Sequence, residues 1–309
     1  MSNISVSGSL TNHSDNCVGG LAGYINNTSM TYCTAAVNID GYPLSDTEKG
    51  ACYVGGFAGM IENSDTVENC SATGSISGAK IIAGFVGRTT NSTIKYCSSD
   101  CTVISNSNGY PREFNGGSVV QGNHPDSGGF AGSAMGTEFD FCVARGSLTD
   151  ESGVSLDKDH ELNKPSVISG FLGCATGDDD AEGTHSDITT IIKNSDSYVN
   201  VTAKYITQVC GFASAYAGTD SLEIEHCNYY GKTLSSNGNG ANCSFAFSSD
   251  TAEKSHVKIT ECYSSNNAYD FSTGNGIIGQ STNASSPYTN TINVTLPTIQ
   301  TTTPLGGNA

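Results

Sequence analysis

The stretch VGGFAGMIENSDTVENCSATGSISG, residues 54–78, holds two phrases that recur along the chain. The first phrase, Gly-Gly-Phe-Ala-Gly in this stretch, is a pair of small residues, then a large apolar residue, and then Ala and Gly. The second is Asn-Cys-Ser-Ala, at the other end of the stretch. A chain that repeats such a unit at intervals of tens of residues builds its fold by stacking copies of the unit.

Two columns appear when the copies are aligned. The first is the large apolar residue after the small pair: Leu21, Phe57, Phe85, Phe130, Phe171, Phe212, Phe245 and, in a degraded copy, Ile277. The second is a cysteine, replaced by Ser195 in the fifth copy: Cys33, Cys70, Cys97, Cys142, Cys227 and Cys262. Small and apolar residues follow each cysteine with period two, which predicts a strand with one buried face. An apolar residue three positions before the cysteine breaks this parity and predicts a bend between two short strands.

Each copy therefore predicts three short strands, and no segment shows a sustained helical period. Three short strands cannot bury their own apolar face, so the copies must stack on one another. We expect an all-β fold, a right-handed parallel β-helix, or solenoid, of about seven to eight three-strand coils with loop insertions. The repeats span 1–280, a capping strand is expected within 281–300, and 301–309 is expected to be a linker or tail.

The repeated phrase resembles the GLUG-motif repeat, a Gly-rich unit of bacterial surface and adhesin-like proteins, over about residues 4–280. The resemblance implies a secreted or cell-surface β-solenoid of the kind assigned to cell adhesion, and it supplies no catalytic motif. Because VSGSLT at residues 6–11 aligns with later ATGSIS-type strands, the chain is expected to begin within a coil. Further repeats and domains are therefore expected in a longer parent protein.

The charge balance excludes two classes of partner. The chain has 13 Lys plus Arg against 30 Asp plus Glu, a formal charge of −17, so it repels nucleic acid and anionic membranes. No apolar stretch is long enough to span a bilayer, so no direct membrane insertion is expected. The 12 cysteines and many Asn-x-Ser/Thr sequons fit an extracellular protein.

The cysteine column favours stacked, buried free thiols, because Ser195 fits the same slot. Disulfides remain an alternative, with Cys17 to Cys33 and Cys210 to Cys227 as candidate pairs within single coils. A zinc site is not expected, because the chain has no Cys-x-x-Cys and no paired histidine spacing.

Loops that interrupt a solenoid commonly carry its binding residues. The insertions at 105–126 and 149–167 follow the same strand of consecutive coils, so they are expected to be neighbours on one edge. A site there for a glycan or a host or matrix protein would use Tyr110, Arg112, Glu113, Lys158 and His160. For the first of these loops, an ordinary exposed turn around Pro111 is the favoured explanation.

Calcium is the one cofactor that the acidic loops suggest, and none is required. Calcium needs several converging oxygens, which a run of carboxylates in a turn supplies. The candidate ligands are Asp157, Asp159, Glu161, Asp178, Asp179 and Asp180. A solvated acidic surface explains the same residues and is favoured by the acidic composition of the whole chain.

The sequence thus predicts a non-enzymatic, extracellular repeat module that serves as an adhesin segment or as a rigid spacer. The alternative is a carbohydrate-active parallel β-helix enzyme, a polysaccharide lyase or a glycoside hydrolase. Catalysis would require carboxylates from at least two coils to converge on one sugar. Instead, outward strand positions are mostly Ser, Thr, Asn and Gly, and Glu138, Asp140, Lys95 and Lys193 are expected to be scattered surface charges.

Overall fold

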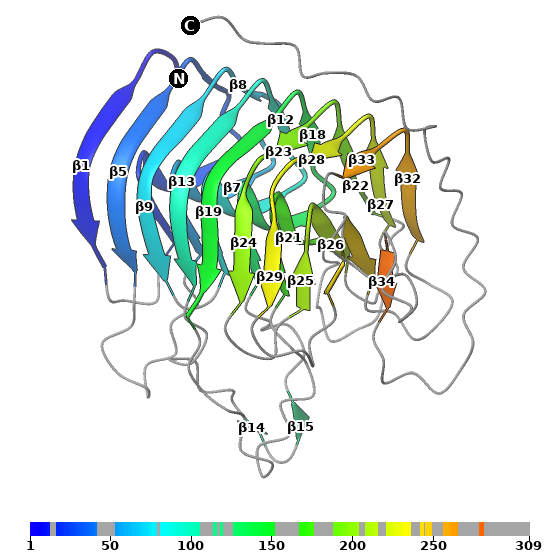
Figure 1. The fold of residues 1–309 in the computed structure, drawn as a ribbon. Helices are drawn as coiled ribbons and strands as arrows, with labels where there is room; N and C mark the ends of the chain where they lie inside the picture. Colours follow the sequence, from blue (N-terminus) through cyan, green and yellow to red (C-terminus); the bar gives the residue numbers. More distant parts are fainter. Residues whose placement is uncertain are drawn as a thin grey trace, which may run out of the picture.

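The computed structural model shows a row of coils in which each coil lies beside the next (Figure 1). The structure describes residues 1–12, 17–41, 53–78, 81–105, 114–115, 118–119, 126–151, 167–175, 188–203, 208–215, 221–235, 242–243, 245–248, 256–264 and 278–280. The strands of the coils pair in parallel to form four long sheets, numbered here by their order within a coil. The predicted parallel β-helix is therefore confirmed, while its right-handed sense stays a prediction.

The first two sheets carry the Gly-rich phrase. The first sheet consists of β2 (Val18–Gly19), β6 (Tyr53–Gly55), β10 (Ile81–Ala83), β16 (Asp126–Gly128), β20 (Val167–Ser169), β25 (Gln208–Cys210) and β30 (Asn242–Cys243). The second consists of β3 (Ala22–Asn26), β7 (Ala58–Glu62), β11 (Val86–Thr90), β17 (Ala131–Met135), β21 (Leu172–Ala175), β26 (Ala213–Ala215), β31 (Ala246–Ser248) and β34 (Ile278–Gln280).

The other two sheets lie on either side of the cysteine column. The third sheet consists of β4 (Met30–Thr31), β8 (Val67–Glu68), β12 (Thr93–Lys95), β18 (Glu138–Asp140), β22 (Thr189–Lys193), β27 (Ser221–Glu225) and β32 (His256–Thr260). The fourth consists of β1 (Ser5–Thr11), β5 (Thr34–Gly41), β9 (Ser71–Gly78), β13 (Ser98–Ser105), β19 (Val143–Asp150), β23 (Asp196–Ser197), β24 (Asn200–Ala203), β28 (Asn228–Tyr229), β29 (Thr233–Ser235) and β33 (Tyr263–Ser264). A separate antiparallel pair, β14 (Phe114–Asn115) and β15 (Ser118–Val119), lies in the first insertion.

A regular coil therefore contains four strands rather than the predicted three. The Gly-rich phrase does not form one strand, because β6 ends at Gly55 and β7 begins at Ala58. The chain turns at Gly56, where an added Cβ would lie 2.2 Å from the carbonyl oxygen of Gly84 in the next coil. Only glycine allows the backbones to approach so closely at this turn. The strands on either side are too short for a period-two pattern to separate them in the sequence.

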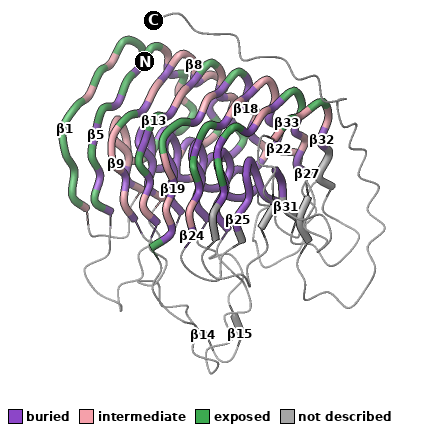
Figure 2. Tube along the Cα trace, viewed as in Figure 1, coloured by how far each residue is buried: buried purple, intermediate pink, exposed green. Residues whose placement is uncertain are grey.

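The core is a continuous column of aromatic rings at this turn. Phe57, Phe85, Phe130, Phe171, Phe212 and Phe245 are fully buried, and successive rings stack with centroids 4.7–5.0 Å apart. Phe139 of the third sheet meets Phe130 and Phe171 edge to face at 5.9 and 5.8 Å. Figure 2 shows the buried residues along the inner faces of the coils. The predicted apolar column is therefore the centre of the fold; its last member, Ile277, lies outside the described residues.

The predicted bend before the cysteine is confirmed, and it has one backbone conformation throughout. The corner column is the set of residues that adopt positive φ, between 51° and 56°, where the third sheet passes into the fourth: Asn3, Tyr32, Asn69, Tyr96, Phe141, Asn194, His226 and Glu261. Side chains in the corner column are exposed or half-buried, and the next residue points into the core. The residue at the corner therefore turns the chain. It also shifts the alternation of inward and outward side chains by one position, so that the cysteine faces the core.

The last described strand, β34, ends at Gln280, and the extent of the repeat region over 1–280 stays a prediction. The expected capping strand within 281–300 and the tail at 301–309 lie outside the described residues.

Candidate binding surface

The cysteine column lies directly behind the corner and contributes to packing. Cys142 is buried, and its Sγ lies 3.4 Å from the carbonyl oxygen of Ile94 and 3.6 Å from that of Asp140. Its backbone N–H donates to Ser195 Oγ at 3.0 Å, so the serine replaces a thiol in the same ladder. Burial raises the pKa of the Cys142 thiol to about 12, which keeps the thiol neutral. The column is structural, as the free-thiol interpretation predicts.

Cys17, Cys33, Cys210 and Cys227, the members of the alternative pairings, form no disulfide bond. Cys17 and Cys210 precede the column cysteine of their own coils by similar numbers of residues. They do not, however, occupy equivalent positions in the coil. Cys17 precedes Val18, whose partner is Val54, whereas Cys210 pairs with Ser169, the position equivalent to Gly55. The proposed disulfides therefore do not form in this structure.

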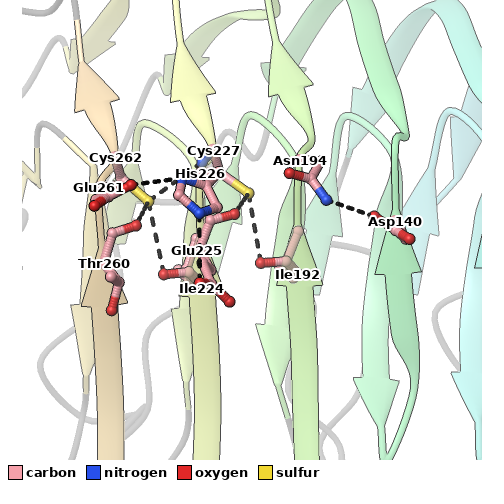
Figure 3. A network of polar contacts seen from close by, with 10 residues as sticks. All are labelled: Asp140, Ile192, Asn194, Ile224, Glu225, His226, Cys227, Thr260, Glu261 and Cys262. Carbon is pink, nitrogen blue, oxygen red and sulfur yellow. Dashed lines mark hydrogen bonds and ion pairs between the residues drawn. The ribbon is translucent and has the colours of Figure 1, made fainter.

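Polar side chains at the corner connect neighbouring coils (Figure 3). Asn194 Nδ2 donates to Asp140 Oδ1 at 2.9 Å. His226 lies between two carboxylates, with Nδ1 at 2.9 Å from Glu261 Oε2 and Nε2 at 3.4 Å from Glu225 Oε1. Glu225 and Glu261 come from consecutive coils, yet the side chains of both are more than half exposed. That environment lacks the burial that usually tunes a catalytic acid.

The charges around Phe139 are connected, which corrects the expectation of scattered surface charges. Glu138 Oε1 lies 2.8 Å from Lys193 Nζ and 3.4 Å from Lys95 Nζ, so one carboxylate joins three successive coils. The hydrogen bond from Lys193 lowers the pKa of Glu138, and the Lys95 charge adds to this effect. The two lysines keep the Glu138 carboxylate ionised and ion-paired. The three side chains are therefore best explained as a structural link between coils.

Exposed aromatic side chains gather beside this corner. Among the described residues, all exposed large aromatic residues except Tyr24 lie in the corner column, on the fourth sheet or directly after one of its strands. We define the aromatic strip as five of these residues, each 42–51% exposed, together with one arginine: Tyr96, Phe141, Arg145, Tyr198, Tyr230 and Tyr263. They come from five successive coils and form two groups, with Tyr96 and Phe141 in the corner column and the other four residues after the cysteine column.

Ring contacts order the aromatic strip along the solenoid. Tyr96 stacks on Phe141 at 5.2 Å, and Tyr198 stacks on Tyr230 at 4.8 Å. The Arg145 guanidinium lies 5.3 Å from the centroid of the Tyr198 ring, within cation–π range. Tyr263 lies 5.9 Å from Tyr230 and is tilted by 46°. The rings are therefore positioned by their neighbours on a rigid sheet.

A polar pair lies among these rings. Asp196 and Asn228 are directly paired on neighbouring strands, and Asn228 Nδ2 donates to Asp196 Oδ1 at 2.8 Å. Tyr198 and Tyr230, which are exposed, each follow directly after the end of one of these two strands. Burial raises the pKa of Tyr230, and the Asp196 carboxylate adds to the shift. The surface therefore combines aromatic rings with oriented hydrogen-bonding groups.

The ligand and calcium candidates predicted from the sequence belong to the insertions. Those residues all lie outside the described part of the chain: Tyr110, Arg112, Glu113, Asp157, Lys158, Asp159, His160, Glu161, Asp178, Asp179 and Asp180. The aromatic strip was missed, although the alignment contained a signal for it. Arg145, Tyr198 and Tyr230 each stand three positions after the cysteine column, and an odd offset from that inward column points outward.

Neither a metal site nor a membrane span is found in the part of the chain that the structure describes. No group of three or more His, Cys, Asp or Glu side chains there is arranged to hold a metal ion. The same residues include no helix long and apolar enough to cross a membrane.

Comparison with known families agrees with the repeat. Residues 14–40 and 50–77 match the GLUG motif, which confirms the resemblance stated from the sequence. The search of curated proteins finds no match. The chain is therefore a repeat module that contains GLUG motifs and forms a parallel β-solenoid.

Proposed function

We propose that this solenoid is an extracellular, non-enzymatic module that acts as an adhesive segment of a larger surface protein. The aromatic strip is the observation that supports this proposal. Large aromatic residues exposed on a rigid surface are a usual feature of binding sites, and their concentration beside one corner is not needed for coil stacking. The adhesive function uses that surface, with a glycan or a host or matrix protein as the partner.

A rigid spacer is the second candidate, and the core supports it. The aromatic stack and the parallel pairing run through successive coils without interruption from Phe57 to Phe245. Such a rod holds its ends apart without any ligand. A spacer, however, requires no exposed aromatic residues, so the adhesive function accounts for more of the structure.

An adhesion assay tests this proposal. Beads coated with the chain are applied to surfaces bearing epithelial cells, matrix proteins or polysaccharides, in calcium and again in chelator. We expect retention on at least one surface, relative to beads coated with heat-denatured chain. Retention lost on chelation would assign the contact to the acidic loops. An absence of retention on every surface in both buffers would contradict the adhesive function and leave the spacer.

A further inference from the structure

The aromatic strip has an outward pattern that suggests a particular ligand chemistry. Asp196 and Asn228 are paired on neighbouring strands, and Tyr198 and Tyr230 each follow directly after the end of one of these strands. Asn228 Nδ2 lies 2.8 Å from Asp196 Oδ1, and the centroids of the Tyr198 and Tyr230 rings lie 4.8 Å apart. Two hydrogen-bonding groups and two stacked rings thus share an area comparable with a small molecule or a sugar unit.

The polar centre argues against a protein partner. A protein interface usually places an apolar cluster at its centre and polar groups at its rim. Here the Asp196–Asn228 pair lies among the rings, with Tyr198 and Tyr230 on one side and Tyr263 on the next coil. Burying that pair under an apolar partner would cost free energy unless the partner supplied matching hydrogen bonds. Hydroxyl groups, which donate and accept, supply them readily.

The charges argue against an anionic ligand. Asp140, Asp196, Glu225 and Glu261 lie on or beside the aromatic strip, in a chain of formal charge −17. The cations nearby are already engaged: the Arg145 guanidinium lies over the Tyr198 ring, and Lys95 and Lys193 are ion-paired with Glu138. A sulfated or uronic acid polymer would be repelled at this surface.

We propose that the aromatic strip binds a neutral glycan, whose sugar rings lie against Tyr198, Tyr230 and Tyr263 and whose hydroxyls bond to Asp196 and Asn228. The ring faces and edges of tyrosine contact the C–H surfaces of a sugar, while its phenol remains available for hydrogen bonding. Because the strip crosses successive coils, it fits an extended oligosaccharide better than a single sugar. The proposal rests on the adhesive function and specifies its ligand and its site.

The test measures binding of the whole chain to immobilised polysaccharides. The neutral probes are mannan, galactan, cellulose and chitin; heparin is the anionic probe, and fibronectin and collagen are the protein probes. We expect binding to at least one neutral polysaccharide. This binding should persist in 0.5 M salt, about three times physiological ionic strength, because no ion pair contributes to it. Tyr198→Ala with Tyr230→Ala should weaken this binding about tenfold or more, a typical effect for a residue that dominates an interface.

Tyr24→Ala is the matched control, because Tyr24 is an exposed tyrosine on the second sheet, away from the strip. It should change the affinity less than about twofold. Thermal unfolding of each variant checks the fold, and Tyr263→Ala, which alters another coil, replaces the double variant if that variant is unfolded. An equal loss in Tyr24→Ala, or no loss in either strip variant, would overturn the site.

The remaining outcomes separate the two proposals. Binding only to heparin would overturn the neutral ligand, and binding only to fibronectin or collagen would overturn the glycan while the adhesive function stands. An absence of binding to every probe, together with an absence of bead retention on cells, would overturn both.

Discussion

The rings of Phe130 and Phe171 lie 4.9 Å apart and within 4° of parallel, although 41 positions (171 − 130) separate them in the chain. The same stacking recurs from coil to coil, so the identity of one residue in each repeat builds a continuous core. Stability should therefore depend on single members of this column.

Phe130→Ala should lower the free energy of unfolding by about 3–5 kcal/mol, because it leaves a cavity between two stacked rings. Phe141→Ala is the matched control, since Phe141 is about half exposed and its loss should cost less than about 1 kcal/mol. Urea unfolding followed by circular dichroism measures both values. Equal costs for the two variants would show that the buried column does not carry the stability.

Gly84→Ala should destabilise the fold by about 2 kcal/mol or more, because the new Cβ would lie 2.3 Å from the carbonyl oxygen of Gly129. Gly78→Ala should cost less than about 1 kcal/mol, because its Cβ meets only the side chains of Val54 and Ile82, at 3.3 Å. Ser105 occupies the position of Gly78 in the next coil, so a side chain fits there. Thermal unfolding that is insensitive to both changes would contradict the close contact between coils.

Asn63→Val should cost about 1–2 kcal/mol, because Asn63 adopts a φ of 49° that a β-branched residue accepts poorly. Asn63→Gly should leave stability within about 0.5 kcal/mol of the original protein, since glycine adopts this conformation freely. The comparison uses chemical unfolding at neutral pH. A greater loss for glycine than for valine would show that the Asn63 side chain matters more than its backbone.

Cys142→Ser should reduce the loss of stability at alkaline pH. Burial raises the pKa of the folded Cys142 thiol from 9.0 to about 12, so the folded state holds this proton more tightly than the unfolded state. The resulting stabilisation is complete below pH 9 and is lost as the pH rises towards 12. A serine hydroxyl does not titrate in this range and fits the ladder as Ser195 does. The measurement is the urea midpoint of both proteins at pH 7, 9 and 10.5; an identical pH dependence would contradict the buried neutral thiol.

The repeat columns allowed the fold to be predicted because stacking requires the same residue type at the same place in every coil. That requirement predicts the column of large apolar residues, the cysteine column, the bend before Cys97 and the small residues that follow it. The division into four strands could not be predicted, because strands such as Tyr53–Gly55 are too short to show a period. The corner column shares only its φ value, and residues as different as Tyr96 and Glu261 adopt it.

The aromatic strip could have been predicted from its offset to the cysteine column, but outward positions have no packing rule that makes their residues recur. Three positions after the cysteine column, earlier coils carry Ala36, Thr73 and Asp100, so the tyrosines of two later coils do not form a repeating column. A search for function in loops alone overlooks a surface built by strands.

Hydroxyl-radical footprinting of the whole chain, free and bound to the surface that retains it, shows which side chains the ligand covers. We expect the bound chain to be oxidised several-fold less at Tyr198, Tyr230 and Tyr263, since a ligand on the aromatic strip covers their rings. Oxidation of Tyr24 on the second sheet should be unchanged. Protection of Tyr24 with the strip still oxidised would contradict the account and place the binding surface elsewhere on the solenoid.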